Sequence, residues 1–373
     1  MNSLGINKDP KDTRVVVAMS GGVDSSVVAG LMKQSGYDVI GITLQLYDYG
    51  LAVGKKGACC AGQDIYDAKM VADKLAIPHY VLDYESKFKE AVIDDFTESY
   101  MRGETPIPCV RCNQTVKFRD LVAMARELKA DALATGHYVR RVMGEKGAEM
   151  HRAADLGRDQ SYFLFTTSQD QLDFLRFPLG DLPKSATREM ARELGLIVAD
   201  KPDSQDICFV PNGDYASVVK KIRPDAAQGG DIVDLQGKVL GRHEGIIHYT
   251  IGQRRGIGVG GGEALYVISV EPRTKRVVVG PKEALGKDRF WVNELNWLAE
   301  EIPGQGLKVQ ARMRSSQPLV DATIFMRGAG KAEIILDVPH QGIAPGQAGV
   351  FYRNDRMLGG GWILREEAVT KAA

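Results

Sequence analysis

One stretch of the sequence, residues 20 to 26 (SGGVDSS), has the residue types of a phosphate-binding loop, and we call it the phosphate loop. It follows the apolar run Arg14 to Met19 and precedes apolar residues at helical spacing, which predicts a strand, a turn and a helix. Two glycines let the backbone approach a ligand, and the N–H groups of a first helical turn bind anions. The stretch matches neither GxxxxGK[ST] nor GxGxxG. It is predicted to hold pyrophosphate; the alternative is an ordinary turn with good capping residues.

Cysteines form the second group of candidate residues. Cys109 and Cys112 make a CxxC pair, and Cys208 lies in the acidic stretch DSQDICFV. A CxxC pair serves redox chemistry or metal binding, and the neighbouring Arg111 and Lys117 favour the thiolate. A single cysteine is more often a small buried hydrophobe. Combined with a nucleotide loop, however, these cysteines indicate sulfur transfer.

A third group is Thr135-Gly136-His137-Tyr138, at the end of a predicted strand. Gly136 would allow a nucleotide to approach the backbone closely. His137 is a candidate polar contact, although a histidine here could equally be a satisfied surface residue.

The elements that must position these groups alternate between strand and helix. Strands are predicted near 14–19, 38–46, 79–82 and 131–134, with helices over 27–32, 64–76, 86–101, 115–129 and 184–194. Such alternation indicates βαβ units around a parallel sheet. Ligands bind outside the carboxyl ends of such strands, where the loops 20–26, 44–62, 103–112 and 135–138 should gather.

The pattern changes beyond about residue 225, where short β-branched runs alternate with Gly, Pro and Asp turns. This is typical of all-β structure. We therefore expect a flexible polar tail over 1–12 and an α/β catalytic domain over 13–224. A central β module over 225–282 and a C-terminal β-barrel over 283–373 should follow.

Composition narrows the possible functions. The chain has 373 residues, enough for two or three domains, and 48 basic residues balance 48 acidic ones. Any RNA binding must therefore depend on local basic clusters, such as 220–223, 254–255 and 312–314. No apolar run has the length of a membrane span and no signal peptide is evident, which predicts a cytoplasmic protein without a membrane partner. Five cysteines in a reducing compartment favour catalytic or metal-binding thiols over a disulfide scaffold.

Six motifs together carry a family resemblance. They are SGGVDSS, TPxPxxxCN with its cysteine at 112, ATGHY, RDQSYFL, DSQDICF and HYTIGQRRGIGV. In this order and spacing they resemble the bacterial tRNA-specific 2-thiouridylases, which belong to the ATP pyrophosphatase superfamily. The resemblance covers the chain beyond its first residues. It implies an adenine nucleotide alpha hydrolase-like domain followed by two small β modules.

The resemblance also implies roles for individual residues. ATP would be held by Ala18, Met19, Ser20, Gly21, Gly22, Val23, Asp24, Ser25, Leu44 and Gly136. Cys208 would carry a persulfide, and Cys112 would be the nucleophile that forms a transient disulfide with it. The tRNA and its target base would contact Ile107, Pro108, Cys109, His137, Arg158, Asp159, Gln160, Arg312, Met313, Arg314 and Gln347.

The implied reaction replaces the C2 oxygen of the wobble uridine, U34, by sulfur in tRNAs for Lys, Glu and Gln. ATP with Mg²⁺ would adenylate that oxygen and so turn it into a good leaving group. A persulfide would then deliver sulfur received from a sulfur-relay protein or a cysteine desulfurase. The base would have to be flipped out of the anticodon loop to reach the site.

One departure from the family pattern leaves alternatives open. Cys109 stands where the family usually has an aspartate, so an acid–base role there is in doubt, because a thiol titrates above a carboxylate. Cys109, Cys112 and Cys208 could instead hold a [4Fe–4S] cluster. Zinc would need a fourth ligand, for which Cys59, Cys60 or a histidine could serve. Other classes are an amide-forming adenylating enzyme and a non-catalytic RNA-binding protein.

Overall fold

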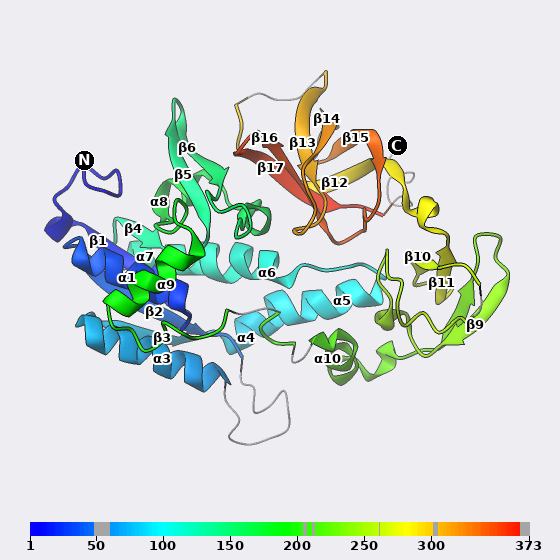
Figure 1. The fold of residues 1–373 in the computed structure, drawn as a ribbon, viewed down its shortest axis with the longest axis horizontal. Helices are drawn as coiled ribbons and strands as arrows, with labels where there is room; N and C mark the ends of the chain where they lie inside the picture. Colours follow the sequence, from blue (N-terminus) through cyan, green and yellow to red (C-terminus); the bar gives the residue numbers. More distant parts are fainter. Residues whose placement is uncertain (48–59, 204–206, 211–212, 261, 301–304, 366–373) are drawn as a thin grey trace. The chain divides into compact units, whose positions relative to one another are not determined.

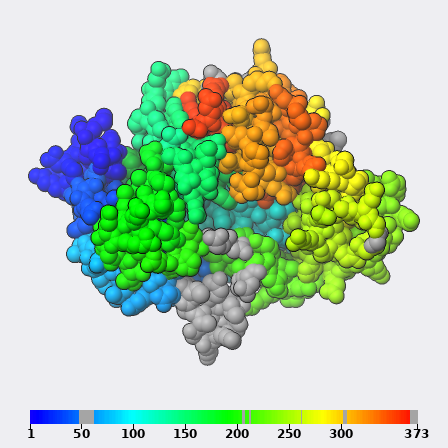
Figure 2. All heavy atoms as spheres, viewed as in Figure 1, coloured from blue at the N-terminus to red at the C-terminus, as the bar shows by residue number. Residues whose placement is uncertain are grey.

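A computed structural model describes the chain except for residues 48–59, 204–206, 211–212, 261, 301–304 and 366–373, and except for the side chains of residues 60 and 61. The described residues are coloured in Figures 1 and 2. The chain divides into two compact units, each built from separate stretches of sequence. Unit 1 comprises 1–91, 109–209 and 355–357, and unit 2 comprises 92–108, 210–354 and 358–373.

Unit 1 is built around a parallel sheet with strand order β3-β2-β1-β4-β7. Its strands are β1 (Arg14–Ala18), β2 (Asp38–Gln45), β3 (His79–Asp83), β4 (Ala132–Ala134) and β7 (Leu175–Arg176). Sequential strands run outward from β1 on one side and β4 lies on the other, so the order reverses between β1 and β4. A ligand site is expected outside the carboxyl ends at such a reversal. The phosphate loop and residues 135–138 follow these two strands.

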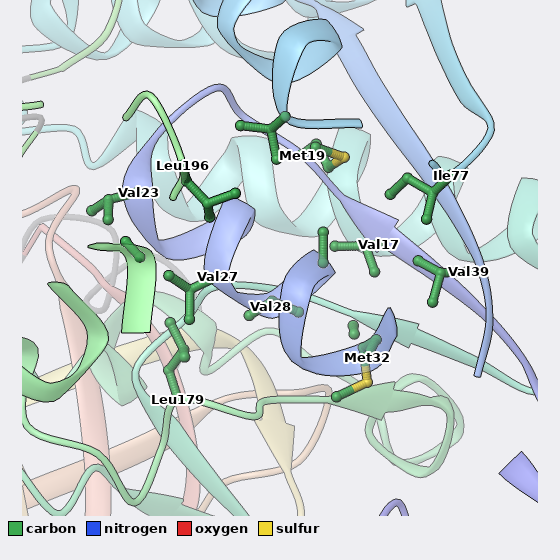
Figure 3. Packing of buried hydrophobic residues seen from close by; sticks show 14 of the residues in the cluster. Val17, Met19, Val23, Val27, Val28, Met32, Val39, Ile77, Leu179 and Leu196 are labelled. Atoms are coloured by element: carbon green, nitrogen blue, oxygen red, sulfur yellow. The ribbon is translucent and has the colours of Figure 1, made fainter. Parts of the chain in front are cut away.

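The helices of unit 1 include α1 (Val23–Gln34), α3 (Cys60–Leu75), α4 (Glu85–Phe88), α7 (Val122–Glu127), α8 (Gln169–Phe174) and α9 (Lys184–Glu193). Helix α1 buries Val27, Val28 and Met32 against Val17 of the central strand (Figure 3). These residues recur at helical spacing, so they form the single apolar face that the sequence predicts. Burial of this face fixes α1, and with it the phosphate loop, on the sheet.

Three features of unit 1 differ from expectation. Within residues 1–12, expected to form a flexible tail, Leu4 is buried, and Arg176 Nε donates to the Leu4 carbonyl oxygen at 2.8 Å. Residues 108–112, predicted to lie in a loop, are helical: they form α6 (Pro108–Arg111) and the start of a π-helix (Cys112–Leu121). An unpredicted hairpin, β5 (Val139–Gly144) with β6 (Gly147–Arg152), follows the third candidate group.

Unit 2 begins with α5 (Asp95–Met101) and α10 (Tyr215–Ile222), and its remaining described elements are mostly strands. A small sheet has the order β10-β11-β8-β9, from β8 (Gly230–Val233), β9 (Val239–His243), β10 (Tyr266–Glu271) and β11 (Arg276–Gly280). The next strands are β12 (Lys287–Trp297), β13 (Leu307–Arg312), β14 (Val320–Met326), β15 (Ala332–His340), β16 (Ala348–Arg353) and β17 (Arg356–Ile363). They pair in the order β12-β15-β14-β13-β16-β17, and β12 also pairs with β17, which closes a barrel.

The predicted fold class, an α/β domain followed by all-β modules, is confirmed. Residues 92–108, however, belong to unit 2 although the sequence places them among the α/β elements. Among the described helices, none has both the length and the apolar composition needed to span a membrane.

Candidate functional site

The phosphate loop has the geometry of an anion site. Gly22 is the N-cap of α1 and has no side chain to accept hydrogen bonds from the first-turn N–H groups. Those groups can therefore bind an anion. The Ser25 hydroxyl holds the loop in shape, because it accepts from Ser20 N at 3.1 Å and donates to the Gly22 carbonyl oxygen at 3.3 Å.

Two glycines bring other elements against this loop. Gly21 has a φ of +75°, and a Cβ there would lie 2.1 Å from the Asp64 carbonyl oxygen on α3. A Cβ on Gly136 would lie 2.9 Å from Ser25 N. The loops after β1 and β4 therefore touch, as their positions in the sheet predict. Leu44, also expected at the nucleotide site, is partly buried on β2 and pairs with Leu82 of β3.

His137 lies beside these loops in unit 1. Its Nδ1 is 2.9 Å from Thr135 Oγ1, and its ring meets the ring of Phe118 edge-on at 5.7 Å. Burial, reinforced by the charge of Lys117, lowers the pKa of His137 to about 3. The imidazole is therefore neutral at pH 7, and it has hydrogen-bonding nitrogens but no positive charge.

Asp24 anchors the first turn of α1 in a network of charges. Lys184, the first residue of α9, donates to Asp24 Oδ1 at 2.7 Å and Oδ2 at 2.8 Å. The Tyr138 hydroxyl also donates to Asp24 Oδ1 at 2.9 Å, and it lies 3.0 Å from Thr187 Oγ1. Asp24 therefore fixes the orientation of the phosphate loop relative to α9 and to the strand end at Tyr138.

The network continues into residues 201–203, which precede Cys208 in the sequence and which we call the cysteine segment. Lys184 also lies 2.9 Å from Asp203 Oδ1, and Arg188 and Arg158 donate to the same carboxylate at 2.8 and 2.9 Å. Burial alone would raise the pKa of Asp203, but the three cations more than offset it and lower that pKa. Asp203 is therefore ionised at neutral pH.

Lys201, on the same segment, makes a second connection. Its ammonium donates to the Gly21 carbonyl oxygen at 3.0 Å, to Asp64 Oδ1 at 2.6 Å and to Asp67 Oδ2 at 2.5 Å. Burial disfavours this charge, yet the two carboxylates raise the pKa of Lys201 overall. The cysteine segment is thus held to the phosphate loop at two points.

The three candidate cysteines all belong to unit 1. Cys112 is buried, whereas Cys109 and Cys208 are exposed residues. Protein atoms nevertheless crowd the Cys208 thiol, and this desolvation, with the charges of Cys112 and Cys109, raises its pKa to about 12. Cys112 and Cys109 therefore both lie within electrostatic range of the Cys208 thiol.

Burial also raises the pKa of the Cys112 thiol, and Lys117 acts in the opposite direction. The sequence predicts that Arg111 and Lys117 favour the thiolate. The charge of Lys117 does lower the pKa of Cys112, as predicted. Burial of the thiol raises that pKa by more, so the net shift is upward. Both thiols are therefore protonated at neutral pH.

The cluster and zinc alternatives find no support in the described part of the chain, where no group of three His, Cys, Asp or Glu side chains is arranged to hold a metal ion. The three thiols do not form a chelating set. Cys59 and the side chain of Cys60, considered as further ligands, lie outside the described residues.

The tRNA candidates of unit 1 have intrachain partners. Arg158 pairs with Asp203, and Gln160 Oε1 accepts from Tyr138 N at 2.9 Å. The Asp159 side chain has no exposed surface, and it accepts from Ser161 N and Oγ at 3.1 and 3.0 Å. These contacts order the loop that presents Arg158, whose side chain is 45% exposed. RNA contact by this loop stays a prediction.

The tRNA candidates of unit 2 fall into two places. Gln347 Nε2 donates to the Thr105 carbonyl oxygen at 2.9 Å, so the segment leading to Ile107 and Pro108 lies beside Gln347. Arg312 and Met313 are buried. Arg314 donates to the carbonyl oxygens of Ile251 and Gly342 at 2.7 and 3.0 Å. Arg314 therefore joins separate parts of unit 2, and contact of Arg312, Met313 and Arg314 with RNA stays a prediction.

Sequence reasoning missed Lys184, Lys201 and Asp203, which connect the phosphate loop to the cysteine segment. Asp203 is the first residue of the motif DSQDICF, without a role having been assigned to it, and Lys201 precedes it by two positions. Their charges, close in sequence to the candidate nucleophile Cys208, could have marked Lys201 and Asp203 as site residues. Nothing in the sequence marks Lys184, because it begins an ordinary amphipathic helix.

Comparison with known proteins adds family matches to this geometry. Residues 13–212 match a family model described as a tRNA methyl transferase HUP domain. Residues 216–281 match a tRNA methyl transferase PRC-barrel domain, and 287–363 match an aminomethyltransferase beta-barrel domain.

Curated relatives match almost the whole chain. The chain is 64% identical over 376 residues to the tRNA-specific 2-thiouridylase MnmA of Rhodospirillum centenum, and the match covers 99% of this chain and 96% of that protein. For the protein of the same name from Paracoccus denitrificans the identity is 63% over 367 residues, with 97% and 94% covered. For that of Rickettsia massiliae it is 59% over 362 residues, with 97% and 99% covered.

Proposed function

Because the chain belongs to the tRNA-specific 2-thiouridylase family, we propose that it converts the wobble uridine U34 of tRNAs for Lys, Glu and Gln to 2-thiouridine, with cleavage of ATP to AMP and pyrophosphate. The observation that carries this proposal is the phosphate loop, whose first-turn N–H groups have no side-chain cap and which belongs to the same unit as Cys112 and Cys208. Two thiols in the unit that holds a phosphate loop suit ATP-driven sulfur transfer.

In the proposed first step, the phosphate loop binds the pyrophosphate part of ATP, and Leu44 and Gly136 line the nucleotide. The C2 oxygen of the uracil attacks the α-phosphate, and pyrophosphate leaves toward the first-turn N–H groups of α1. Mg²⁺ would be held mainly by the phosphates, since no acidic cluster of the described residues is arranged to bind it. When bound, it neutralises charge on the departing pyrophosphate.

In the proposed second step, Cys208 carries a persulfide received from a sulfur-relay protein or a cysteine desulfurase. The outer sulfur attacks C2 of the adenylated base, and AMP leaves with the former C2 oxygen. The Cys112 thiolate then attacks the Cys208 sulfur, which breaks the S–S bond and leaves the sulfur on the base. A Cys112–Cys208 disulfide remains and must be reduced before the next turnover.

The tRNA contacts and the domain assignment are part of the proposal. We assign the anticodon region to His137, Arg158, Asp159, Gln160 and Gln347, with Ile107, Pro108 and Cys109 at the flipped base and Arg312, Met313 and Arg314 in the barrel. The catalytic domain would span 13–224, the central β module 225–282 and the tRNA-binding barrel 283–373.

The test is thiolation in vitro with tRNA, ATP, Mg²⁺ and a persulfide donor, followed by mass spectrometry of the nucleosides. The parent protein should form 2-thiouridine, and Cys112→Ser and Cys208→Ser should each form none. Pyrophosphate release in the presence of tRNA should survive both substitutions, because adenylation precedes sulfur transfer. Thiolation by either variant would contradict the assigned roles.

The same assay excludes the other classes. An amide-forming adenylating enzyme would release pyrophosphate without any requirement for tRNA. A non-catalytic RNA-binding protein would bind tRNA and release no pyrophosphate at all.

A further inference from the structure

Asn113 is a buried polar residue that the proposed chemistry does not use, and it follows Cys112 directly in the sequence. Cys112 begins the π-helix, and the two residues are only 6% and 3% exposed. Asn113 Nδ2 donates a hydrogen bond to the Phe163 carbonyl oxygen at 3.2 Å. The turn that bears Cys112 is therefore tied, at the next residue, to a part of the chain that is remote in sequence.

The hydrogen bonding of Asn113 does not serve stability alone. Its other polar atom, Oδ1, is buried and accepts no hydrogen bond from any described residue. An unsatisfied buried acceptor costs at least as much free energy as one hydrogen bond between neutral groups contributes. The gain in stability from the contact with Phe163 is therefore offset, which points to another role for that contact.

Phe163 is fixed in turn to the strand end at Tyr138. It lies in the short 3₁₀ helix Ser161–Leu164, and its N–H donates to the Gln160 carbonyl oxygen at 2.9 Å. Gln160 N donates to the Tyr138 carbonyl oxygen at 3.0 Å, and Tyr138 N donates to Gln160 Oε1 at 2.9 Å. This double contact holds the stretch 160–163 on the residues that follow β4.

Tyr138 completes a connection to the phosphate loop. Its hydroxyl donates to Asp24 Oδ1, in the first turn of α1, at 2.9 Å. Each member of the resulting series of hydrogen bonds is a described residue of unit 1, in the order Asp24, Tyr138, Gln160, Phe163 and Asn113. The series begins at the phosphate loop and ends beside Cys112.

An exposed ion pair joins the same two stretches of chain at another place. Arg126 lies on α7, which continues the π-helix, and its Nη2 donates to both carboxylate oxygens of Asp170 on α8 at 2.8 Å. Both side chains are largely exposed, at 45% and 71%. An exposed pair of this kind contributes little. It lies at the far end of the helical run from Cys112, so it provides a matched control.

We propose that Asn113 is a positioning residue that holds Cys112 in place relative to the phosphate loop, through the series of hydrogen bonds that starts at the Phe163 carbonyl oxygen. This inference rests on the proposed function, in which the outer sulfur of the Cys208 persulfide attacks the adenylated base and AMP leaves. At that stage a disulfide bond joins the new sulfur on C2 to Cys208. Cys112 must then attack the Cys208 sulfur.

Displacement of Cys112 would impair this last step alone. In the step, the Cys112 thiol gives its proton to water and its sulfur bonds to the Cys208 sulfur. The electron pair of the broken S–S bond stays on the sulfur attached to C2, so 2-thiouridine is released and a Cys112–Cys208 disulfide forms. Without a well-placed Cys112, the tRNA stays covalently bound to Cys208.

The test is a single turnover of protein whose Cys208 carries a persulfide, with tRNA, ATP and Mg²⁺ and without added thiol. Asn113→Leu removes the donor to Phe163 and keeps a side chain of similar size. We expect it to release 2-thiouridine about tenfold more slowly than the parent, since one hydrogen bond has an effect of that order. Pyrophosphate release should match that of the parent, because adenylation precedes the attack by Cys112.

The slow variant should also accumulate a covalent tRNA–protein adduct, detected on a denaturing gel without reductant. A small thiol added afterwards should release 2-thiouridine from this adduct, because it attacks the Cys208 sulfur in place of Cys112. A purely structural defect would not produce the adduct, since a loss of fold lowers pyrophosphate release and adduct formation together.

Further variants serve as references. Cys112→Ser should accumulate the same adduct, whereas Arg126→Gln should behave as the parent in every measurement. If Asn113→Leu does not fold, Asn113→Ala decides the question in the same assay.

Release of 2-thiouridine at the parent rate in the Asn113 variants, slow release without the adduct, or an equal slowing in Arg126→Gln would each overturn the inference. Failure of the proposed function has a different signature, since the parent itself would then form neither the adduct nor 2-thiouridine.

Discussion

At the scale of single residues, desolvation dominates the pKa values of Cys112 and Cys208, the two thiols proposed to act in sulfur transfer. It raises the pKa of Cys112, and it raises that of Cys208 to about 12, while Lys117 lowers both. Below its pKa, the thiolate fraction of a thiol grows tenfold per pH unit. Both thiols are therefore protonated at neutral pH in the protein without substrate.

Alkylation kinetics test this directly. The rate of Cys208 modification by iodoacetamide, followed by peptide mass spectrometry, should rise continuously from pH 7 to pH 10. Lys117→Met should slow alkylation of Cys112 and Cys208 about threefold to tenfold at fixed pH, because loss of the positive charge raises both pKa values. A plateau near pH 8.5 would show that desolvation does not control the thiol.

Cys109 provides a second test at this scale. Under the persulfide mechanism Cys112 and Cys208 suffice, so Cys109→Ala should retain thiolation at a rate close to that of the parent. Nucleoside mass spectrometry after anaerobic and aerobic assays gives the answer. Complete loss of thiolation in this variant would assign Cys109 to the chemistry.

At the scale of elements, Gly21 decides how closely α3 approaches the phosphate loop. It has φ +75°, and an added Cβ would meet the Asp64 backbone at 2.1 Å. Gly5 has almost the same φ, +73°, with nothing within 4 Å of such a Cβ. An alanine at Gly5 would therefore introduce backbone strain alone, whereas an alanine at Gly21 would introduce the same strain and a steric clash.

Gly5→Ala should destabilise the protein by about 1–2 kcal/mol, the cost of a left-handed conformation, and should leave pyrophosphate release unchanged. Gly21→Ala should cost more and should abolish pyrophosphate release, because α3 or the loop must move. Urea unfolding and the pyrophosphate assay measure both effects. If both variants lost the same stability and kept full pyrophosphate release, the close approach of α3 to Gly21 would not be needed for activity.

At the scale of the whole molecule, the zero net charge leaves RNA binding to local clusters. Arg312 is buried with its guanidinium over the Tyr352 ring, Arg314 donates to the Gly342 carbonyl oxygen, and Arg223 pairs with Glu98 and Asp225. Arg254 and Arg255 are exposed, and no carboxylate of the described residues forms an ion pair with either. They are therefore the first choice for phosphate contacts.

The double variant Arg254→Gln/Arg255→Gln should reduce the slope of log K against log salt for tRNA binding by about one to two units, since each phosphate contact releases counterions. Lys308→Gln is the control, because Lys308 is already paired with Asp337 at 2.8 Å. Titrations at several salt concentrations measure the slope. An unchanged slope in the double variant would place the phosphate contacts elsewhere.

The sequence by itself determined the local elements and the family. The run RVVVA forms β1 and the apolar spacing after residue 26 forms α1, because each pattern reflects which face of a short element is buried. The phosphate loop and the cysteine motifs were also recognisable, since their residue types and order are set by chemistry rather than by packing.

Only the tertiary structure decided how these parts work together. The bonds of Lys184 to Asp24 and of Lys201 to Gly21 join residues 160 and 180 positions apart, and no local pattern encodes such pairs. Burial is likewise a property of the folded chain, and so the desolvation that outweighs Lys117 at Cys112 could not be read from neighbouring charges. The burial of Leu4, within residues 1–12, depends on a core that the rest of the chain builds.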